Sequence, residues 1–183
     1  MITRHRARWV ALTVAVVLVG FGVVLAVQHR PEESVPRLVQ EHKPVPNFDL
    51  TTLDNKSIST RSLAGKTYVV NFWNSWCIPC RQEQPALQRF YAAHRNEPDF
   101  AMVGIVRDDD PNPIRAYVAD RGVSWPVAFD PKGKAGLGFG TTGQPETYVI
   151  SPTGVAACGG IGPVTQDELE SWLQIARSGS VCA

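Results

Sequence analysis

Hydrophobic residues follow two patterns along the chain: one unbroken run near the N-terminus, and short runs separated by polar residues after it. The unbroken run extends from Trp9 to Val27 and carries no charged residue and no strongly polar group apart from Thr13. A helix of about nineteen residues is about 28 Å long, close to the roughly 30 Å thickness of a bilayer core. The pattern predicts a membrane anchor, a transmembrane helix, within residues 1–27.

A cleaved secretory signal is the alternative for this segment, because Val24–Ala26 resembles a small-residue cleavage site. Signal-peptide apolar cores usually have about 7–15 residues, which favours the uncleaved anchor. Arg4, Arg6 and Arg8 precede the run, and the positive-inside rule places them in the cytoplasm. Both interpretations place everything after Val27 outside the cytoplasm, as a single-pass membrane protein or as a secreted one.

Residues 28–45 are polar, interrupted by prolines and without a helical apolar stripe, which is typical of a flexible tether. The folded domain is predicted to comprise residues 46–183. It opens with two short alternating runs around Asp54-Asn55, a pattern that indicates a β-hairpin.

Two nearly unbroken apolar runs in this domain, residues 67–73 and 100–106, predict strands buried on both faces. Apolar residues after the first run recur at helical spacing: Leu87, Phe90, Tyr91 and His94. This spacing predicts an amphipathic helix between the two strands. A further helix is predicted around residues 114–118, and a short strand within residues 125–130.

The C-terminal part of the domain shows a hairpin pattern and then a helix. Residues 146–161 contain two strand-like runs around a Pro-Thr-Gly turn, and Thr165 and Glu168 form a capping box. The expected buried stripe of that helix is Leu169, Trp172, Leu173 and Ala176. Strands that alternate with helices and end in a hairpin and a helix predict an α/β fold with a mixed sheet.

Composition narrows the function classes. The chain has 183 residues, and its hydrophobic content of 44% suits one packed domain plus a smaller segment. Its formal net charge is +1, and no basic run interleaved with aromatic residues follows the N-terminal segment, so nucleic-acid binding has no electrostatic basis. We interpret the acidic run Asp108–Asp110 as a solvated loop rather than a cation site.

The candidate chemistry lies in Cys77 and Cys80, which are separated by two residues. Covalent haem attachment requires a histidine directly after the second cysteine, where this chain has Arg81. A zinc site requires two further ligands, usually a second closely spaced pair, and the remaining cysteines are far apart in the sequence. A purely structural disulfide across so short a loop adds little stability, so thiol–disulfide exchange explains the spacing best.

The expected placement of the cysteines supports redox exchange. Cys77 falls where a buried strand passes into a helix, near free backbone N–H groups and the positive end of the helix dipole. That position lowers the pKa of the thiol and supplies a nucleophilic thiolate. Cys80, one turn further along, is expected to be shielded from solvent and to act as the resolving thiol. Pro79 restricts the first turn without removing a needed donor, whereas Pro85 is expected to kink the helix.

Four segments resemble, in order, the membrane-tethered TlpA/ResA/DsbE-like (CcmG-like) group of thioredoxin-fold proteins. They are VPNFDL, LAGKTYVVNFW, WCIPCRQEQP and GTTGQPETYVISPTG, and the similarity extends from about Pro46 to Arg177. The resemblance implies a thioredoxin fold, with a mixed sheet flanked by helices and an N-terminal hairpin extension. It also implies a thiol-disulfide oxidoreductase with a redox-active Cys77–Cys80 disulfide and without a metal or another cofactor.

The resemblance also suggests which residues bind the substrate. Pro145 matches a cis-proline that faces the cysteines, and the backbone of Gln144 would pair with a bound peptide by strand addition. Trp76, directly before Cys77, is expected to contact the substrate. Glu146 matches a glutamate of the cytochrome c maturation members, although a solvated loop acid is an equally good interpretation.

Two further positions concern proton transfer. Glu83 matches a carboxylate that the ResA-like group places near the cysteines, and partial burial would raise its pKa toward the working range. It lies one helical turn after Cys80 and would help to deprotonate that thiol. The alternative is an exposed glutamate on the helix surface. Asn71 occupies the place of the buried aspartate of cytoplasmic thioredoxins, and its amide cannot transfer a proton.

The group implies that this protein reduces disulfides of exported proteins, with apocytochrome c before haem attachment as the expected substrate. A DsbD/CcdA-like membrane protein would supply the electrons. Some relatives oxidise secreted proteins instead, and the residues between the cysteines do not fix the direction, so a disulfide oxidase is the alternative. A metal or haem chaperone is less favoured, because methionine, a soft ligand, is nearly absent. A peroxidase would need an activating threonine and arginine around a single nucleophilic cysteine.

Cys158 and Cys182 are additional to the pattern of this group. The C-terminal helix and the stretch from Cys158 to the start of that helix each span roughly 20 Å, so the tail can return to the strand that holds Cys158. An extracytoplasmic compartment permits disulfides. We therefore predict a structural Cys158–Cys182 disulfide, with free thiols or a second redox centre as the alternatives.

Overall fold

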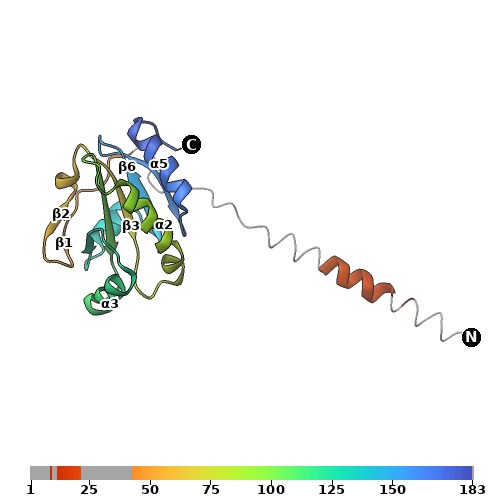
Figure 1. Ribbon diagram of the computed structural model, residues 1–183. Helices are drawn as coiled ribbons and strands as arrows, with labels where there is room; N and C mark the ends of the chain where they lie inside the picture. The colour runs from red at the N-terminus through yellow and green to blue at the C-terminus, as the bar shows by residue number, and fades with distance from the viewer. Residues whose placement is uncertain (1–8, 10–11, 22–42, 183) are drawn as a thin grey trace, which may run out of the picture. The chain divides into compact units, whose positions relative to one another are not determined.

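The computed structural model describes residues 9, 12–21 and 43–182 of the chain. The chain divides into two compact units, residues 1–33 and 34–183. Figure 1 draws residues 12–21 of the first unit as a helix and the second unit as a sheet with helices around it.

Residues 12–21 form a helix whose side chains are exposed. Within the described residues, no helix is both long enough and apolar enough to cross a membrane. The remainder of the predicted anchor at residues 1–27, apart from Trp9, and residues 28–42 of the predicted tether lie outside the described residues.

The second unit is built on one mixed sheet of seven strands in the order β2-β1-β5-β4-β3-β6-β7. The strands are β1 (Asp49–Thr52), β2 (Ser57–Ser59), β3 (Thr67–Phe72), β4 (Phe100–Val106), β5 (Val127–Phe129), β6 (Glu146–Ile150) and β7 (Ala156–Ile161). β3, β4 and β5 run parallel to one another, and the remaining pairings are antiparallel. The predicted mixed sheet and N-terminal hairpin are confirmed.

Helices cover both faces of this sheet. They are η1 (Thr60–Leu63), α2 (Ile78–His94), α3 (Pro111–Arg121), α4 (Lys134–Phe139) and α5 (Gln166–Arg177). On one face, Leu87 of α2, Ile114 of α3 and Leu169 of α5 share a buried cluster with Val69 of β3. On the other face, Phe139 of α4 packs with Phe72 of β3 and neighbouring buried residues.

The local sequence signals place most of these elements correctly. The apolar runs became β3 and β4, and the predicted C-terminal hairpin became β6 and β7. The capping box also forms, because the backbone N–H of Thr165 donates to Glu168 Oε2 and the backbone N–H of Glu168 donates to Thr165 Oγ1. Helix α4 was not predicted, since two glycines interrupt its six residues and leave no apolar stripe.

Candidate active site

Cys77 and Cys80 form a disulfide at the N-terminus of α2. Cys77 is the N-cap residue, and its Sγ accepts a hydrogen bond of 3.2 Å from the backbone N–H of Cys80. The predicted placement at a strand-to-helix transition is therefore correct. Both cysteines are buried, with 4% of Cys77 and 2% of Cys80 exposed, so shielding does not distinguish the two in the oxidised state.

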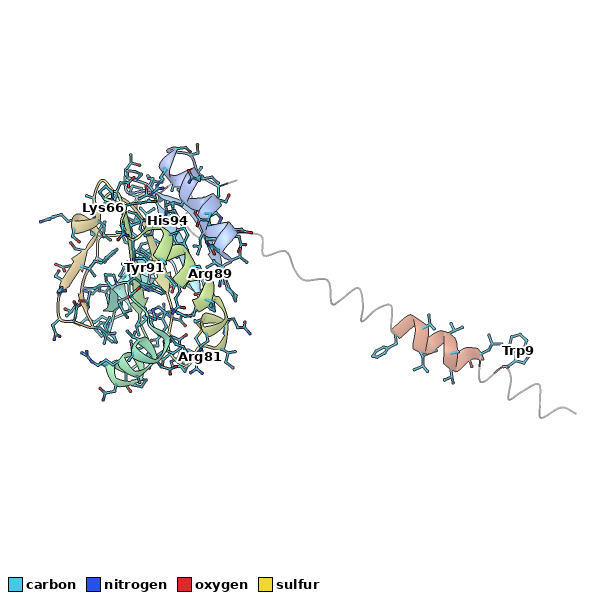
Figure 2. The ribbon with its side chains drawn as sticks, viewed as in Figure 1. Trp9, Lys66, Arg81, Arg89, Tyr91 and His94 are labelled. Atoms are coloured by element: carbon cyan, nitrogen blue, oxygen red, sulfur yellow. A yellow bond between two sulfur atoms is a disulfide. The ribbon has the colours of Figure 1, made fainter. Side chains whose placement is uncertain are left out.

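Helix α2 holds the disulfide at its first turn. Pro79 lies in that turn, where a missing N–H leaves no acceptor unpaired, and the helix continues through Pro85 to His94. Figure 2 shows Arg81, the residue after Cys80, at one end of α2, and His94 at the other. The cysteine pair thus lies at the N-terminal end of α2, whose buried side packs in the core.

Glu83 lies one turn after Cys80, and 2% of it is exposed. Asn71 Nδ2 donates to Glu83 Oε1 over 2.8 Å, and the backbone N–H of Val164 donates to Glu83 Oε2 over 3.1 Å. Burial is the largest influence and raises the pKa of Glu83 to about 8, while the two hydrogen bonds oppose it. The exposed-glutamate alternative is excluded by this burial, and the expected pKa direction agrees.

Asn71 connects Glu83 to the neighbouring strand. It lies in β3 opposite Thr147 of β6, and its Nδ2 also donates to Thr147 Oγ1 over 2.9 Å. One amide group therefore fixes the orientation of the Glu83 carboxyl. Sequence reasoning did not identify Thr147 and Val164, because their contacts join segments 76 and 81 residues apart.

The Gln144–Pro145 peptide bond is cis, as predicted. Phe72, the last residue of β3, pairs in register with Glu146, the first residue of β6. Gln144–Pro145 consequently lies beside the point where the chain leaves the sheet toward Cys77. The two segments that the resemblance assigned to the site are neighbours in the fold.

Glu146 corrects an expectation from the sequence. The interpretation as a solvated loop acid is wrong, because Glu146 is fully buried. Its Oε1 accepts from the backbone N–H groups of Thr142 and Gly143, over 2.6 Å and 2.8 Å, and Oε2 accepts from the Tyr148 hydroxyl over 2.8 Å. Glu146 therefore holds the loop before Pro145 through buried hydrogen bonds, and a part for this residue in substrate binding stays a prediction.

The rim of the site is apolar and exposed. Trp76 is 57% exposed and Ile78 is 68% exposed, on either side of Cys77. Trp76 Nε1 donates to the backbone carbonyl of Asp108 over 3.0 Å, which fixes the indole above the loop after β4. Large exposed apolar side chains next to a reactive thiol suit contact with a protein substrate.

The acidic run also differs from its interpretation as a wholly solvated loop. Asp109 is half-buried, and its Oδ2 accepts hydrogen bonds from the backbone N–H and the hydroxyl of Ser75, over 2.7 Å and 2.6 Å. Asp108 and Asp110 are exposed. No local sequence signal indicates the Ser75–Asp109 contact, since its partners are 34 residues apart.

The second cysteine pair forms the predicted disulfide. Cys158 lies in β7 and is fully buried, and Cys182 reaches it from the tail after α5. The backbone N–H of Cys182 also donates to the carbonyl of Ala157 over 2.8 Å, which adds a hydrogen bond from the tail to β7.

Fold and site together define a class: thioredoxin-fold proteins in which a CxxC disulfide caps a helix beside a cis-proline. The chain belongs to the AhpC/TSA family, whose model matches residues 42–157. The resemblance to the ResA and DsbE group is confirmed by the relatives.

Two relatives and one solved structure illustrate the similarity. The chain is 31% identical over 137 residues to the thiol-disulfide oxidoreductase ResA of Bacillus thuringiensis, covering 74% of this chain and 78% of that protein. It is 32% identical over 134 residues to the thiol:disulfide interchange protein DsbE of Xylella fastidiosa, covering 72% of this chain and 66% of that protein. The crystal structure of a DsbF homologue from Corynebacterium diphtheriae matches with a TM-score of 0.68 and 26% identity, over 80% of this chain and 96% of that one.

Proposed function

We propose that this protein reduces disulfide bonds of exported proteins by exchange through Cys77 and Cys80. It is a thiol-disulfide oxidoreductase of the ResA and DsbE type. The observation that carries the proposal is the Cys77–Cys80 disulfide at the N-terminus of α2, where the backbone N–H of Cys80 donates to Cys77 Sγ. The same N–H and the helix dipole would stabilise a thiolate on Cys77 in the reduced protein.

The reaction proceeds in two exchange steps. The Cys77 thiolate attacks one sulfur of a substrate disulfide, which forms a mixed disulfide and releases the other substrate sulfur as a thiolate that takes up a proton. Cys80 then loses its proton to the Glu83 carboxylate and attacks Cys77 Sγ. The mixed disulfide breaks, the second substrate sulfur leaves as a thiolate that takes up a proton, and two electrons have passed to the substrate. The Cys77–Cys80 disulfide seen in the structure is the product of this half-reaction.

The substrate is positioned by the exposed rim and by the loop before Pro145. Strand addition to the backbone of Gln144 would bring a peptide cysteine to Cys77, while Trp76 and Ile78 contact apolar neighbours of that cysteine. The substrate class we propose is an exported protein with an accessible disulfide, and apocytochrome c before haem attachment is the specific candidate. A membrane protein of the DsbD/CcdA kind would reduce the Cys77–Cys80 disulfide after each turnover.

We further propose that residues 1–27 anchor the protein in the cell membrane and that the catalytic domain is extracytoplasmic. The support is the apolar run from Trp9 to Val27 behind three arginines. Carbonate extraction of membranes and labelling of intact cells with a membrane-impermeant thiol reagent test the two statements. Release of the full-length chain by carbonate, or labelling that requires lysis, would contradict them.

The reduction potential of the Cys77–Cys80 pair decides the direction of electron flow. A value near about −270 mV, that of thioredoxin, supports a reductase, whereas one near about −120 mV, that of DsbA, makes the protein an oxidase. A Cys80→Ser variant expressed in cells should accumulate mixed disulfides on Cys77, and a Cys77→Ser/Cys80→Ser variant is the matched control. The absence of any exported protein in the trapped complexes would contradict the proposed substrate class.

A further inference from the structure

The short segment between β3 and Cys77 is held by the loop that follows β4, residues 107–110. Ser75 donates two hydrogen bonds to Asp109 Oδ2, from its backbone N–H over 2.7 Å and from its hydroxyl over 2.6 Å. Trp76 Nε1 donates to the carbonyl of Asp108 in the same loop. Ser75 and Trp76, the two residues before Cys77, therefore both donate hydrogen bonds to this loop.

The Asp109 carboxylate is itself fixed. Its second oxygen, Oδ1, accepts a hydrogen bond of 2.8 Å from the backbone N–H of Asp110. On the opposite side, Arg81 Nε donates over 2.8 Å to the carbonyl of Ser75. Ser75, which is 8% exposed, is thus held by an anion at its backbone N–H and by a cation at its backbone carbonyl.

The contacts of Ser75 with Asp109 and Arg81 affect the geometry of Cys77. The backbone N–H of Cys77 donates to the carbonyl of Asn74 over 3.3 Å, so residues 74–77 form a turn with Ser75 inside it. The turn delivers Cys77 to the N-cap position, where its sulfur meets the N–H of Cys80. A turn that loosens would let this sulfur move away from the donor that stabilises its thiolate.

We propose that Asp109 is a positioning residue that acts through Ser75 to hold Cys77 in its N-cap geometry. This inference rests on the proposed function, in which Cys77 is the attacking thiolate. Charged hydrogen-bond acceptors are stronger than neutral ones, so a carboxylate suits a role in which two donors of one residue must be held together.

Positioning and simple charge have opposite effects, and this makes the proposal testable. Removing a negative charge near a thiol lowers the pKa of that thiol, whereas loss of an aligned N–H donor raises it. Asp110 offers a matched control, because it is the neighbouring acid, is exposed, and makes no side-chain capping hydrogen bond. Asp110→Asn therefore removes one charge in the same loop and leaves Ser75 held.

The experiment is the alkylation of Cys77 by iodoacetamide in the reduced full-length protein, followed by mass spectrometry from pH 5 to 9. Ser75→Ala should raise the pKa of Cys77 by about half a unit or more, which slows alkylation at pH 6.5 about threefold. At the same pH, Cys77 should be alkylated about threefold more slowly in the Asp109→Asn variant than in the Asp110→Asn variant. Ser75→Ala removes the hydroxyl hydrogen bond to Asp109, and Asp109→Asn weakens both bonds from Ser75. Because both changes act on one contact, alkylation of the double variant should be no slower than that of the slower single variant within about twofold.

Circular dichroism of each variant confirms folding before alkylation is compared. The positioning role is overturned if the wild-type protein has an acidic Cys77 and Ser75→Ala leaves its pH profile unchanged. It is also overturned if Asp109→Asn and Asp110→Asn give the same profile. A wild-type Cys77 with the pH profile of an ordinary thiol overturns the proposed function and this inference together.

Discussion

Glu83 is a carboxyl group whose environment disfavours its charge. Burial raises its pKa to about 8, and hydrogen bonds from Asn71 and Val164 keep it from rising further. A carboxyl with such a pKa changes protonation state near neutral pH, where an exposed glutamate is already fully ionised. It can therefore accept the proton of Cys80 and release it again within one catalytic cycle.

We predict that the second exchange step depends on the Glu83 carboxylate. Its rate should rise with pH up to about 8 and then level off, since the ionised form accepts the proton and predominates above that value. Glu83→Gln keeps the size of the side chain but cannot accept a proton, so the step should slow about tenfold or more and lose this inflection. Stopped-flow measurement of product release from a preformed mixed disulfide checks both effects. A variant with the wild-type pH profile would exclude Glu83 as the base.

Glu146 stabilises the loop before Pro145, so we predict that its removal mainly lowers the free energy of unfolding. Glu146→Ala leaves the N–H groups of Thr142 and Gly143 and the hydroxyl of Tyr148 without their acceptor, which should lower the free energy of unfolding by about 3 kcal/mol. Glu146→Gln retains an acceptor oxygen, so its free energy of unfolding should decrease less.

Urea unfolding measures these differences, and Asp120→Ala, which removes an exposed acid of α3, serves as the control. The KM for a disulfide peptide should rise with Glu146→Ala, because the loop includes Gln144. Equal stability of Glu146→Ala and the control would show that the buried carboxylate does not support the loop.

At the scale of elements, the sequence predicted best where the signal is local. Helix α2 and helix α5 follow from helical spacing, and β3 and β4 follow from apolar runs, because burial of one stripe or of both faces imposes those patterns. The cysteine pair and its helix N-terminus are likewise a local motif. Helix α4 carries neither a stripe nor a side-chain cap, so nothing in its six residues marks it.

Contacts between distant segments could not be predicted in this way. The position of β1 beside β5 joins strands about 77 residues apart, and hydrophobic patterning does not specify which strands pair. The burial of Glu146 and the Ser75–Asp109 contact could not be predicted for the same reason. A polar residue is buried where a particular set of donors converges, and that set exists only once the chain has folded.

The connection between β7 and the tail after α5 depends on the Cys158–Cys182 disulfide. The two cysteines are 24 residues apart, so the bond should stabilise the protein by about 3 kcal/mol through loss of chain entropy in the unfolded state. Cys158→Ser/Cys182→Ser should therefore unfold at a lower urea concentration. Cys77→Ser/Cys80→Ser, which opens a loop with a separation of only 3, is the matched control and should lower stability by about half as much. Equal midpoints for the two double variants would contradict a structural role of the second disulfide.

For the whole molecule, the important relation is between the two disulfides. Cys77, Cys80 and Cys158 belong to the same buried cluster on one face of the sheet, and Cys182 packs against it. They are nevertheless separated in the sheet, because Cys158 pairs with Val149, three residues along β6 from Glu146 at the end near the active site. Three residues of strand span about 10 Å, and exchange requires sulfur atoms in contact. The arrangement favours separate roles for the two pairs.

The two disulfides should therefore be reduced in a fixed order. Reduction of Cys77–Cys80 leaves a thiolate at the N-terminus of α2, where the helix dipole and the N–H of Cys80 stabilise it, and this raises the potential of the pair. Reduction of Cys158–Cys182 instead leaves a thiol buried in the core and frees the tail, with no comparable stabilisation of the reduced form. Titration with a dithiothreitol redox buffer, alkylation and mass spectrometry should thus show a species with two labels, on Cys77 and Cys80, before any with four. Labelling of Cys158 and Cys182 before or together with the other pair would contradict this order and favour the alternative, a relay with two redox centres.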